Sequence, residues 1–262
     1  MAGGKTDKTC LTILEYFPGP GKIFLKEVVE KIKTDDKKSA DEALFDALRA
    51  IKNPIESIAF DVPLQLPKCI RCELKCPGYE RCQEPEIKWL RKFYIQLNLN
   101  RKPKKIFTPY TERCVDNFIR TELEENFNPP HALGANAAPL TARAHYISRR
   151  LEKPCIEVYP KLSLWRIGRS LGIQKSYLRF HKHVITGEET RTAIIQHLVE
   201  KDIAFIYHQD IKHLVANPYA FDSFICALTG VLQFTNQVEK RPKGFPKSEK
   251  WLAIPKETLD WP

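Results

Sequence analysis

The sequence predicts a single α/β domain over residues 1–262, interrupted by a cysteine-rich insertion at 68–108. Three observations lead to this fold class. Segments of strand-like alternation are interspersed with amphipathic helical segments, the 262-residue chain can bury a full core, and four cysteines crowd into one short stretch. A hydrophobic content of 43% and a charged content of 28% are those of an ordinary soluble globular protein.

The N-terminal part is expected to run strand, strand, helix, strand. Residues 9–17 and 22–30 both alternate and are rich in β-forming side chains, and the proline–glycine turn between them predicts a hairpin. Ser39 can cap a helix over 40–51, whose apolar residues fall on one face. A strand over 55–60 follows and ends at a carboxylate.

The remainder of the chain alternates helices with short strands. An amphipathic stretch at 84–98 lies in the insertion, and Thr108 with Pro109 predicts the start of a helix over 110–124. Further helices are predicted over 139–151, 162–171, 188–201 and 220–234, and strands over 155–158 and 203–207.

Whether the eight cysteines form disulfides depends on the redox state of the compartment in which the protein resides. The N-terminus has no apolar segment of signal-peptide length, and no apolar run approaches the roughly 18 residues of a membrane span, so we expect a cytoplasmic protein. In a reducing compartment these cysteines are not a disulfide framework. Four of them lie singly in apolar surroundings and are expected to be small buried side chains: Cys10, Cys114, Cys155 and Cys226.

The other four cysteines are spaced for a metal. Cys69, Cys72, Cys76 and Cys82 follow the pattern C-x2-C-x3-C-x5-C, and four thiolates suit a tetrahedral site for a soft metal. The span is that of a zinc knuckle, while the Cys76–Pro77 pair keeps an iron–sulfur cluster as the alternative. Four protein ligands leave no open position, so we expect a structural Zn²⁺.

Three carboxylates form a second candidate constellation. Asp61 ends one predicted strand, Glu157 lies in another, and Asp222 falls in the first turn of the last helix. Acids from different elements can converge on Mg²⁺ or Mn²⁺, which prefer oxygen ligands and activate water against a phosphodiester. For Asp222 a plain helix-end role is the competing interpretation, and buried Glu157 needs either a metal or an arginine as its partner.

Charge points toward a polyanionic partner. The formal net charge is +10, which favours nucleic acid. Residues 175–183, KSYLRFHKH, hold part of it, and Glu112 with Arg113 is expected to pair locally on its helix. The candidate nucleic-acid-binding residues are Arg143, Arg150, His131, Lys175 and Arg179.

Taken together, the segments AFDVPLQLP, TERC, HALGANAAPLTARAHYI, IEVYPKLSLW, AFDSFICALTG and WLAIPK resemble a domain-of-unknown-function family described as predicted nucleases with a ribonuclease H-like fold. The resemblance covers residues 55–256 with gaps. It implies a mixed sheet flanked by helices and two-metal phosphodiester chemistry, with Asp61, Glu157 and Asp222 at the positions of the acidic residues.

The start of the chain departs from that pattern. The family's first strand carries a metal-binding aspartate ahead of a glycine-rich turn, whereas this chain opens as though within the turn, and Asp7 is a poor substitute. Only two strands are predicted before the first helix, where the fold has three. We therefore expect an upstream in-frame extension that encodes an apolar strand, and a stop codon directly before Met1 would contradict it.

Three function classes remain open from the sequence. The first is a metal-dependent nuclease acting on DNA or RNA. The second is a non-catalytic nucleic-acid-binding protein with a structural zinc knuckle. The third is a nucleotide-phosphate enzyme, since the opening GGKTDKT also resembles the phosphate-binding turn of sugar-kinase-like ATPases.

Overall fold

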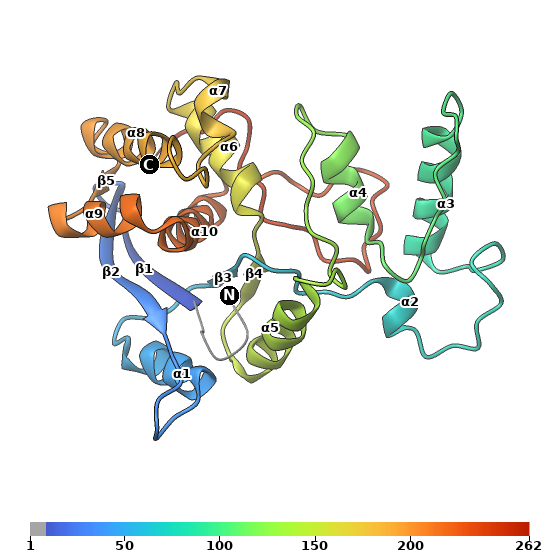
Figure 1. The fold of residues 1–262 in the computed structure, drawn as a ribbon, viewed down its shortest axis with the longest axis horizontal. Coiled ribbons are helices and arrows are strands. Elements are labelled where there is room, and N and C mark those ends of the chain that lie inside the picture. The colour runs from blue at the N-terminus through green and yellow to red at the C-terminus, as the bar shows by residue number, and fades with distance from the viewer. Residues whose placement is uncertain (1–8, 262) are drawn as a thin grey trace. The chain divides into compact units, whose positions relative to one another are not determined.

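A computed structural model of the chain describes residues 9–261, and it divides the chain into two compact units (Figure 1). We call the first the sheet unit, made of the described residues within 1–61, 147–239 and 253–262. The second, the cysteine unit, comprises 62–146 and 240–252. The predicted insertion at 68–108 lies inside the cysteine unit, which extends beyond it on both sides.

The sheet unit holds two small sheets. In the first, β1 (Thr9–Phe17) and β2 (Lys22–Ile32) form the predicted antiparallel hairpin, and β5 (Ala204–Phe205) pairs parallel with β2. In the second, β3 (Ile58–Phe60) and β4 (Cys155–Glu157) pair in parallel. The strand orders are β1-β2-β5 and β3-β4, so the architecture is mixed α/β, as predicted.

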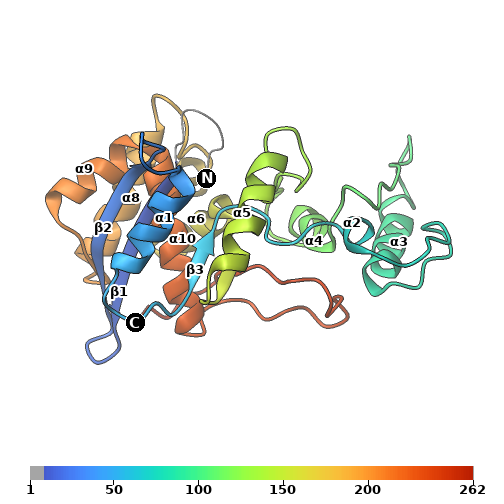
Figure 2. The same ribbon diagram turned by 90° about the horizontal axis from the view of Figure 1, so that it is seen from below.

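Helices pack around these strands (Figures 1 and 2). The longest, α10 (Pro218–Phe234), packs against β1, β3 and α6, and its side chains Phe221, Phe224 and Leu228 are fully buried. The other helices wholly in this unit are α1 (Ala40–Ala50), α6 (Pro160–Ser170), α7 (Lys175–Leu178), α8 (Gly187–Glu200) and α9 (His208–Ala216).

Local sequence accounts for several helix starts. Ser39 caps α1 as predicted: its hydroxyl accepts from the backbone of Glu42, and the Glu42 carboxylate accepts in return from the Ser39 amide. Asn217 caps α10 by accepting from the amides of Tyr219 and Ala220, and Pro218 occupies the first helical position, where its missing N–H costs nothing.

The cysteine unit is mainly helical. It contains α2 (Lys68–Arg71), α3 (Pro85–Leu97) and α4 (Cys114–Thr121), while α5 (Ala138–Arg150) begins in this unit and ends in the sheet unit. Its core is aromatic: Phe245 lies 5.0 Å from the Trp251 ring and 5.6 Å from the Trp89 ring, centroid to centroid. The C-terminal segment 240–252 thereby packs onto α3 within the same unit.

Several predicted boundaries were wrong. The helix expected over 110–124 is α4, Cys114–Thr121, because Arg113 is extended and the Thr108 hydroxyl bonds the Glu112 carboxylate instead of capping a helix. The short helices α2 and α7 and the polar helix α9 were not predicted, since four residues carry no periodicity and α9 is dominated by polar side chains.

The glycine-rich start and Asp7 lie outside the described residues. Within residues 9–261 no single helix is long and apolar enough to cross a membrane; α9 and α10 meet that test only jointly, as a pair bent by 114°.

Candidate functional site

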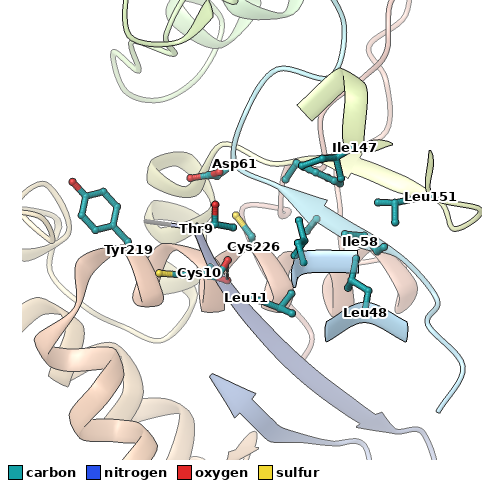
Figure 3. A pocket seen from close by; sticks show the side chains of 14 residues that line it. Thr9, Cys10, Leu11, Leu48, Ile58, Asp61, Ile147, Leu151, Tyr219 and Cys226 are labelled. Carbon is teal, nitrogen blue, oxygen red and sulfur yellow. Dashed lines mark hydrogen bonds between the residues drawn. The ribbon is translucent and has the colours of Figure 1, made fainter. Parts of the chain in front are cut away.

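Asp61 lies at the end of β3, where the sequence predicts it. It is half-buried and lines a pocket of about 70 Å³ together with Thr9 of β1 and with Tyr219 and Ser223 of α10 (Figure 3). Strand β3 delivers the carboxylate to this edge of the sheet, and the prolines that follow do not continue the strand.

Asp222 lies on the same helix as two of those residues and is 2% exposed. Its Oδ1 lies 3.1 Å from Nε2 of His181, and its Oδ2 forms an ion pair with the Lys182 ammonium. His181 is itself 4% exposed, whereas the Lys182 side chain is 53% exposed. A buried carboxylate is thus paired with one buried imidazole and with one cation at the surface.

Asp61 and Asp222 both shift the pKa values of Lys182, Cys10 and Cys226. Burial alone would lower the pKa of Lys182, but Asp222 and then Asp61 outweigh it and raise that pKa. Burial raises the pKa of Cys10 to about 11 and the pKa of Cys226 well above its usual value, and both acids add to each effect. The two carboxylates therefore create one region of negative potential at this end of β1, β3 and α10.

Glu157 does not share this region. It is 6% exposed and pairs in register with Phe60. Ala59 packs against the cluster of Val158, Cys226 and Ala253, so strand alternation places the Phe60 side chain on the opposite face of the two-stranded sheet. The Glu157 side chain lies on that face too, because the two residues are in register. Of the three predicted acids, Asp61 and Asp222 both act electrostatically on Lys182, while strand alternation places the Glu157 side chain on the other face of the two-stranded sheet.

The segment that carries His181 and Lys182 is held by α8. The Thr190 hydroxyl donates to the Tyr177 carbonyl at 2.8 Å, and the Arg191 guanidinium donates to the His181 carbonyl. Gly187 allows this close approach, because a Cβ there would lie 2.7 Å from the same His181 carbonyl oxygen. Helix α8 thus holds the backbone at residues 177 and 181, which positions the imidazole on Asp222.

Lys175 and Arg179, two of the predicted nucleic-acid-binding residues, precede His181 in the chain, and both are exposed. Their cationic groups lie 5.6 Å and 5.9 Å from the centre of the Trp165 ring. The large apolar side chains nearby are also exposed: Phe180 by 54%, Val184 by 92% and Ile185 by 80%. We call residues 175–185 the basic-aromatic segment.

The other predicted nucleic-acid-binding residues lie elsewhere. The Arg150 guanidinium lies over the Phe45 ring at 4.5 Å, so this side chain has a packing role within the sheet unit. His131 is exposed in the loop before α5, and Arg143 is half-buried on α5; both belong to the cysteine unit.

The four clustered cysteines share one loop. Cys69 is on α2, Cys76 is exposed, and the others are half-buried. Burial raises the pKa of the Cys69 thiol, and the thiols of Cys82, Cys76 and Cys72 raise it further, so the four lie within electrostatic range of one another. In the described part of the chain, no three His, Cys, Asp or Glu side chains are gathered closely enough to hold a metal ion.

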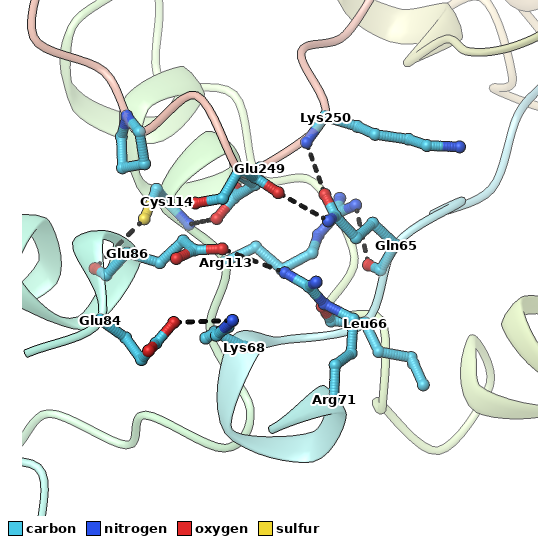
Figure 4. A network of polar contacts seen from close by, with 12 residues as sticks. Gln65, Leu66, Lys68, Arg71, Glu84, Glu86, Arg113, Cys114, Glu249 and Lys250 are labelled. Carbon is cyan, nitrogen blue, oxygen red and sulfur yellow. Dashed lines mark hydrogen bonds and ion pairs between the residues drawn. The ribbon is translucent and has the colours of Figure 1, made fainter. Parts of the chain in front are cut away.

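Two ion pairs close the base of this loop (Figure 4). Lys68 contacts the Glu84 carboxylate at 2.7 Å, and Arg71 contacts the buried Glu86 carboxylate at 3.1 Å. These pairs join α2 to the start of α3, so the loop ends are held while its middle remains exposed. Thiol side chains are the ligands that a soft metal such as zinc prefers, but the described structure does not gather the four cysteines around one point, so the zinc site stays a prediction.

Elemental analysis tests it. We expect about one zinc per chain and no visible absorbance, with zinc lost in Cys69→Ser and Cys82→Ser, because each removes one of four ligands. Cys155→Ser, a half-buried cysteine of the sheet unit, is the matched control and should retain the metal. Iron with sulfide and a brown colour would contradict zinc and favour the iron–sulfur alternative.

The expected pairing of Glu112 with Arg113 was wrong. Glu112 accepts from Tyr94 at 2.5 Å, from Asn117 at 2.8 Å and from Thr108, whereas Arg113 forms two hydrogen bonds with Asp116, at 2.6 and 3.0 Å. The two adjacent residues therefore do not pair with one another, and each has its own separate partners. This network builds the cysteine unit and is not part of the Asp61–Asp222 region.

Sequence reasoning missed His181, Lys182 and Tyr159. The first two lie in the KSYLRFHKH segment, but only their neighbours Lys175 and Arg179 were singled out. Burial raises the pKa of Tyr159 to about 12, and Asp222 contributes, so this tyrosine also belongs to the site. Long-range pairing between residues 181 and 222 leaves no spacing pattern that could reveal it.

The comparisons with known proteins give one result. No curated protein and no solved structure matches this chain significantly. A family model described as "Protein of unknown function (DUF429)" matches residues 21–243, which include Asp61, the four cysteines, His181, Lys182 and Asp222. The chain therefore belongs to the DUF429 family.

Proposed function

We propose that this protein is a metal-dependent nuclease that hydrolyses phosphodiester bonds of DNA or RNA, with Asp61 and Asp222 as the carboxylates that hold Mg²⁺ or Mn²⁺. Hydrolysis adds water across one P–O bond and leaves an alcohol and a phosphate monoester.

The observation that carries it is the Lys182 ammonium on Asp222. This cation lies where the fields of Asp61 and Asp222 overlap. The two acids thus favour a positive charge at one place, at the carboxyl end of β3. A divalent cation with the same oxygen partners would be bound more strongly than a single ammonium, because its charge is twice as large.

The donor set suits a hard cation. Magnesium is usually held by one or two protein carboxylates, together with waters and substrate phosphates, so two acids suffice. When bound, such an ion activates water and stabilises charge on the phosphate. The chain's own contribution is orientation: His181 holds Asp222 through Oδ1, and Arg191 holds His181 through its backbone. Glu157 is left out of this site.

The basic-aromatic segment supports nucleic acid as the substrate. Lys175, Arg179 and Lys182 supply positive charge for phosphates, and exposed Phe180 and Tyr177 offer faces on which bases can stack. The segment continues directly into the residues on Asp222. A strand bound along it would bring its backbone to the two carboxylates.

A cleavage screen tests the proposal. Labelled single-stranded and duplex DNA and RNA are incubated with the protein in Mg²⁺, Mn²⁺ or EDTA, with Asp61→Asn as the variant. We expect cleavage that needs the divalent ion and is lost in Asp61→Asn. Cleavage that persists in EDTA, or that Asp61→Asn leaves unchanged, would contradict the proposed site.

A second candidate is a non-catalytic nucleic-acid-binding protein. The observation that favours it is the same ion pair, because the Lys182 ammonium already neutralises Asp222. Such a protein would bind nucleic acid with an affinity that falls as salt rises, and it would cleave nothing. Its Asp61→Asn variant would bind nucleic acid as tightly as the wild type.

A further inference from the structure

The cysteine unit contains a stretch of the chain without acidic residues. Residues 87–111 include no Asp or Glu, and the exposed members among their Lys and Arg side chains are Lys88, Lys92, Arg101, Lys102 and Lys104. Such a local excess of positive charge favours polyanionic partners. The Asp61–Asp222 region and the basic-aromatic segment belong to the sheet unit, so this charge needs an explanation of its own.

Helix α3 presents part of this charge on one face. Its side chains Ile87, Leu90 and Tyr94 are buried and fall on the side toward the core of the unit. The exposed side chains fall on the opposite side at helical spacing: Lys88, Lys92, Ile95 and Gln96. The apolar face of this helix is therefore already covered, and the face left to solvent is mainly polar and basic.

The loop that follows α3 carries the rest of the charge and is closed at its base (Figure 1). The Asn98 side chain donates to the Lys105 carbonyl at 2.9 Å and accepts from the Lys105 amide at 2.8 Å. Between these two residues Arg101, Lys102 and Lys104 are exposed. Because one side chain ties both ends of the loop, its cations lose less conformational freedom when they bind a partner.

Cations also crowd around the Tyr94 ring at the foot of this loop. The Lys105 ammonium lies 5.7 Å from the centre of that ring. Burial lowers the pKa of Lys105, and Arg120 and Arg101 lower it further against the opposing effect of Glu112. The Glu112 carboxylate is buried and already accepts hydrogen bonds from three side chains. An anion bound from solvent would relieve the repulsion among the cations.

Three aliphatic side chains lie on the same helix face and loop and are exposed: Ile95 by 67%, Leu99 by 73% and Ile106 by 82%. A partner that alternates charged and apolar groups matches this mixture. Nucleic acid does so, because phosphates separate its sugars and bases, and aliphatic side chains beside Lys and Arg can contact or wedge between bases. A lipid surface fits less well, because a membrane-bound helix turns its apolar face to lipid and that of α3 is buried.

We propose that the outer face of α3 and the loop after it form a second nucleic-acid contact, in which Lys88, Lys92, Arg101, Lys102 and Lys104 bind the sugar–phosphate backbone. We call it the α3 surface. Contacts to phosphate carry no sequence information, so this surface binds whatever the base sequence and without a divalent ion. The inference rests on the proposed function only in taking nucleic acid as the partner.

The test is fluorescence anisotropy of labelled single-stranded and duplex DNA and RNA in EDTA, with the full chain. The variant combines Arg101→Gln, Lys102→Gln and Lys104→Gln. We expect its affinity to fall at least about tenfold at roughly 0.1 M salt. On a single strand the slope of log K against log salt should shrink by about 2, because each lost phosphate contact removes about 0.7.

The matched control combines Lys31→Gln, Lys33→Gln and Lys37→Gln, which removes the same charge from exposed side chains of the sheet unit. It should bind as the wild type does, and both variants should keep the wild-type Tm. Equal weakening in the two variants would overturn the proposal, because net charge alone would then explain binding. Unchanged binding in the loop variant would overturn it as well.

Vesicles that contain anionic lipid separate the remaining alternative. Binding to them that is lost in the double variant Ile95→Asn with Leu99→Asn, while binding to nucleic acid is retained, would identify a membrane as the partner and overturn the proposal. We expect no such binding. Because every measurement is made in EDTA and none reads cleavage, failure here is distinct from failure of the proposed nuclease activity.

Discussion

Replacing Asp222 by asparagine should lower divalent-metal-dependent cleavage at least about tenfold. Even outer-shell partners of a metal cost roughly 10–100-fold when they are removed, and a direct ligand should cost no less. Asparagine preserves the shape of the side chain but removes the charge that pairs with Lys182. The measurement is the single-turnover cleavage rate across a Mg²⁺ or Mn²⁺ titration, with folding checked by circular dichroism.

Asp202→Asn is the matched control. Asp202 is also an acid of the sheet unit that pairs with a lysine, Lys22 at 2.5 Å, but its side chain is 86% exposed. Asparagine tolerates the positive φ of 55° at this position. This variant should cleave at the wild-type rate. Equal activity of the Asp222 and Asp202 variants would contradict a metal-binding role for Asp222.

Lys182→Met sharpens the same prediction. If the ammonium occupies the position of the metal, its removal should tighten Mn²⁺ binding by roughly tenfold, which corresponds to ~1.4 kcal/mol. Isothermal titration calorimetry measures this directly, without a nucleic-acid substrate. Unchanged Mn²⁺ affinity in Lys182→Met would indicate that the ion pair with Asp222 is structural.

Replacing Arg113 by alanine should destabilise the cysteine unit by about 3–5 kcal/mol, the range found when one partner of a buried ion pair is removed. Arg113 and Asp116 are 3% and 1% exposed, and the guanidinium holds the carboxylate through two hydrogen bonds (Figure 4 shows the surroundings). Burial is the largest influence on the pKa of Glu249 and raises it, and the nearby Arg113 guanidinium partly offsets this by lowering that pKa. The variant would therefore leave two buried acids without their cation.

The chain divides into two compact units, so unfolding need not follow a single two-state transition and the measurement is local. Hydrogen exchange of peptides from α4 under native conditions should speed up in Arg113→Ala, while peptides from α10 should not change. Arg120→Ala is the control on the same helix, because Arg120 is only half-buried and bonds the neutral Asn117 side chain at 3.0 Å. We expect that control to cost at most about 1 kcal/mol. A similar cost for both variants would contradict the argument from burial.

Local chemistry made part of the fold predictable. The hairpin of β1 and β2, the Ser39 cap and the last helix follow from alternation, a capping box and helical periodicity, which act over a few residues. Asp61 was predictable for a related reason, because a strand that stops at prolines presents the next side chain at the sheet edge. The start of α4 was not predictable, because Glu112, just ahead of this helix, accepts a hydrogen bond from Tyr94 on α3.

By itself the sequence determined the α/β class, the spacing of the four cysteines and the acids worth considering. The tertiary structure alone decided which acids meet: the pairing of Phe60 with Glu157 turns that glutamate away, while His181 and Lys182 arrive at Asp222 from a distant segment. It also decided that the described strands form two sheets, β1-β2-β5 and β3-β4. The same physical reason accounts for both outcomes. Side-chain direction and strand pairing depend on contacts between residues far apart in the chain, and local propensity does not encode those contacts.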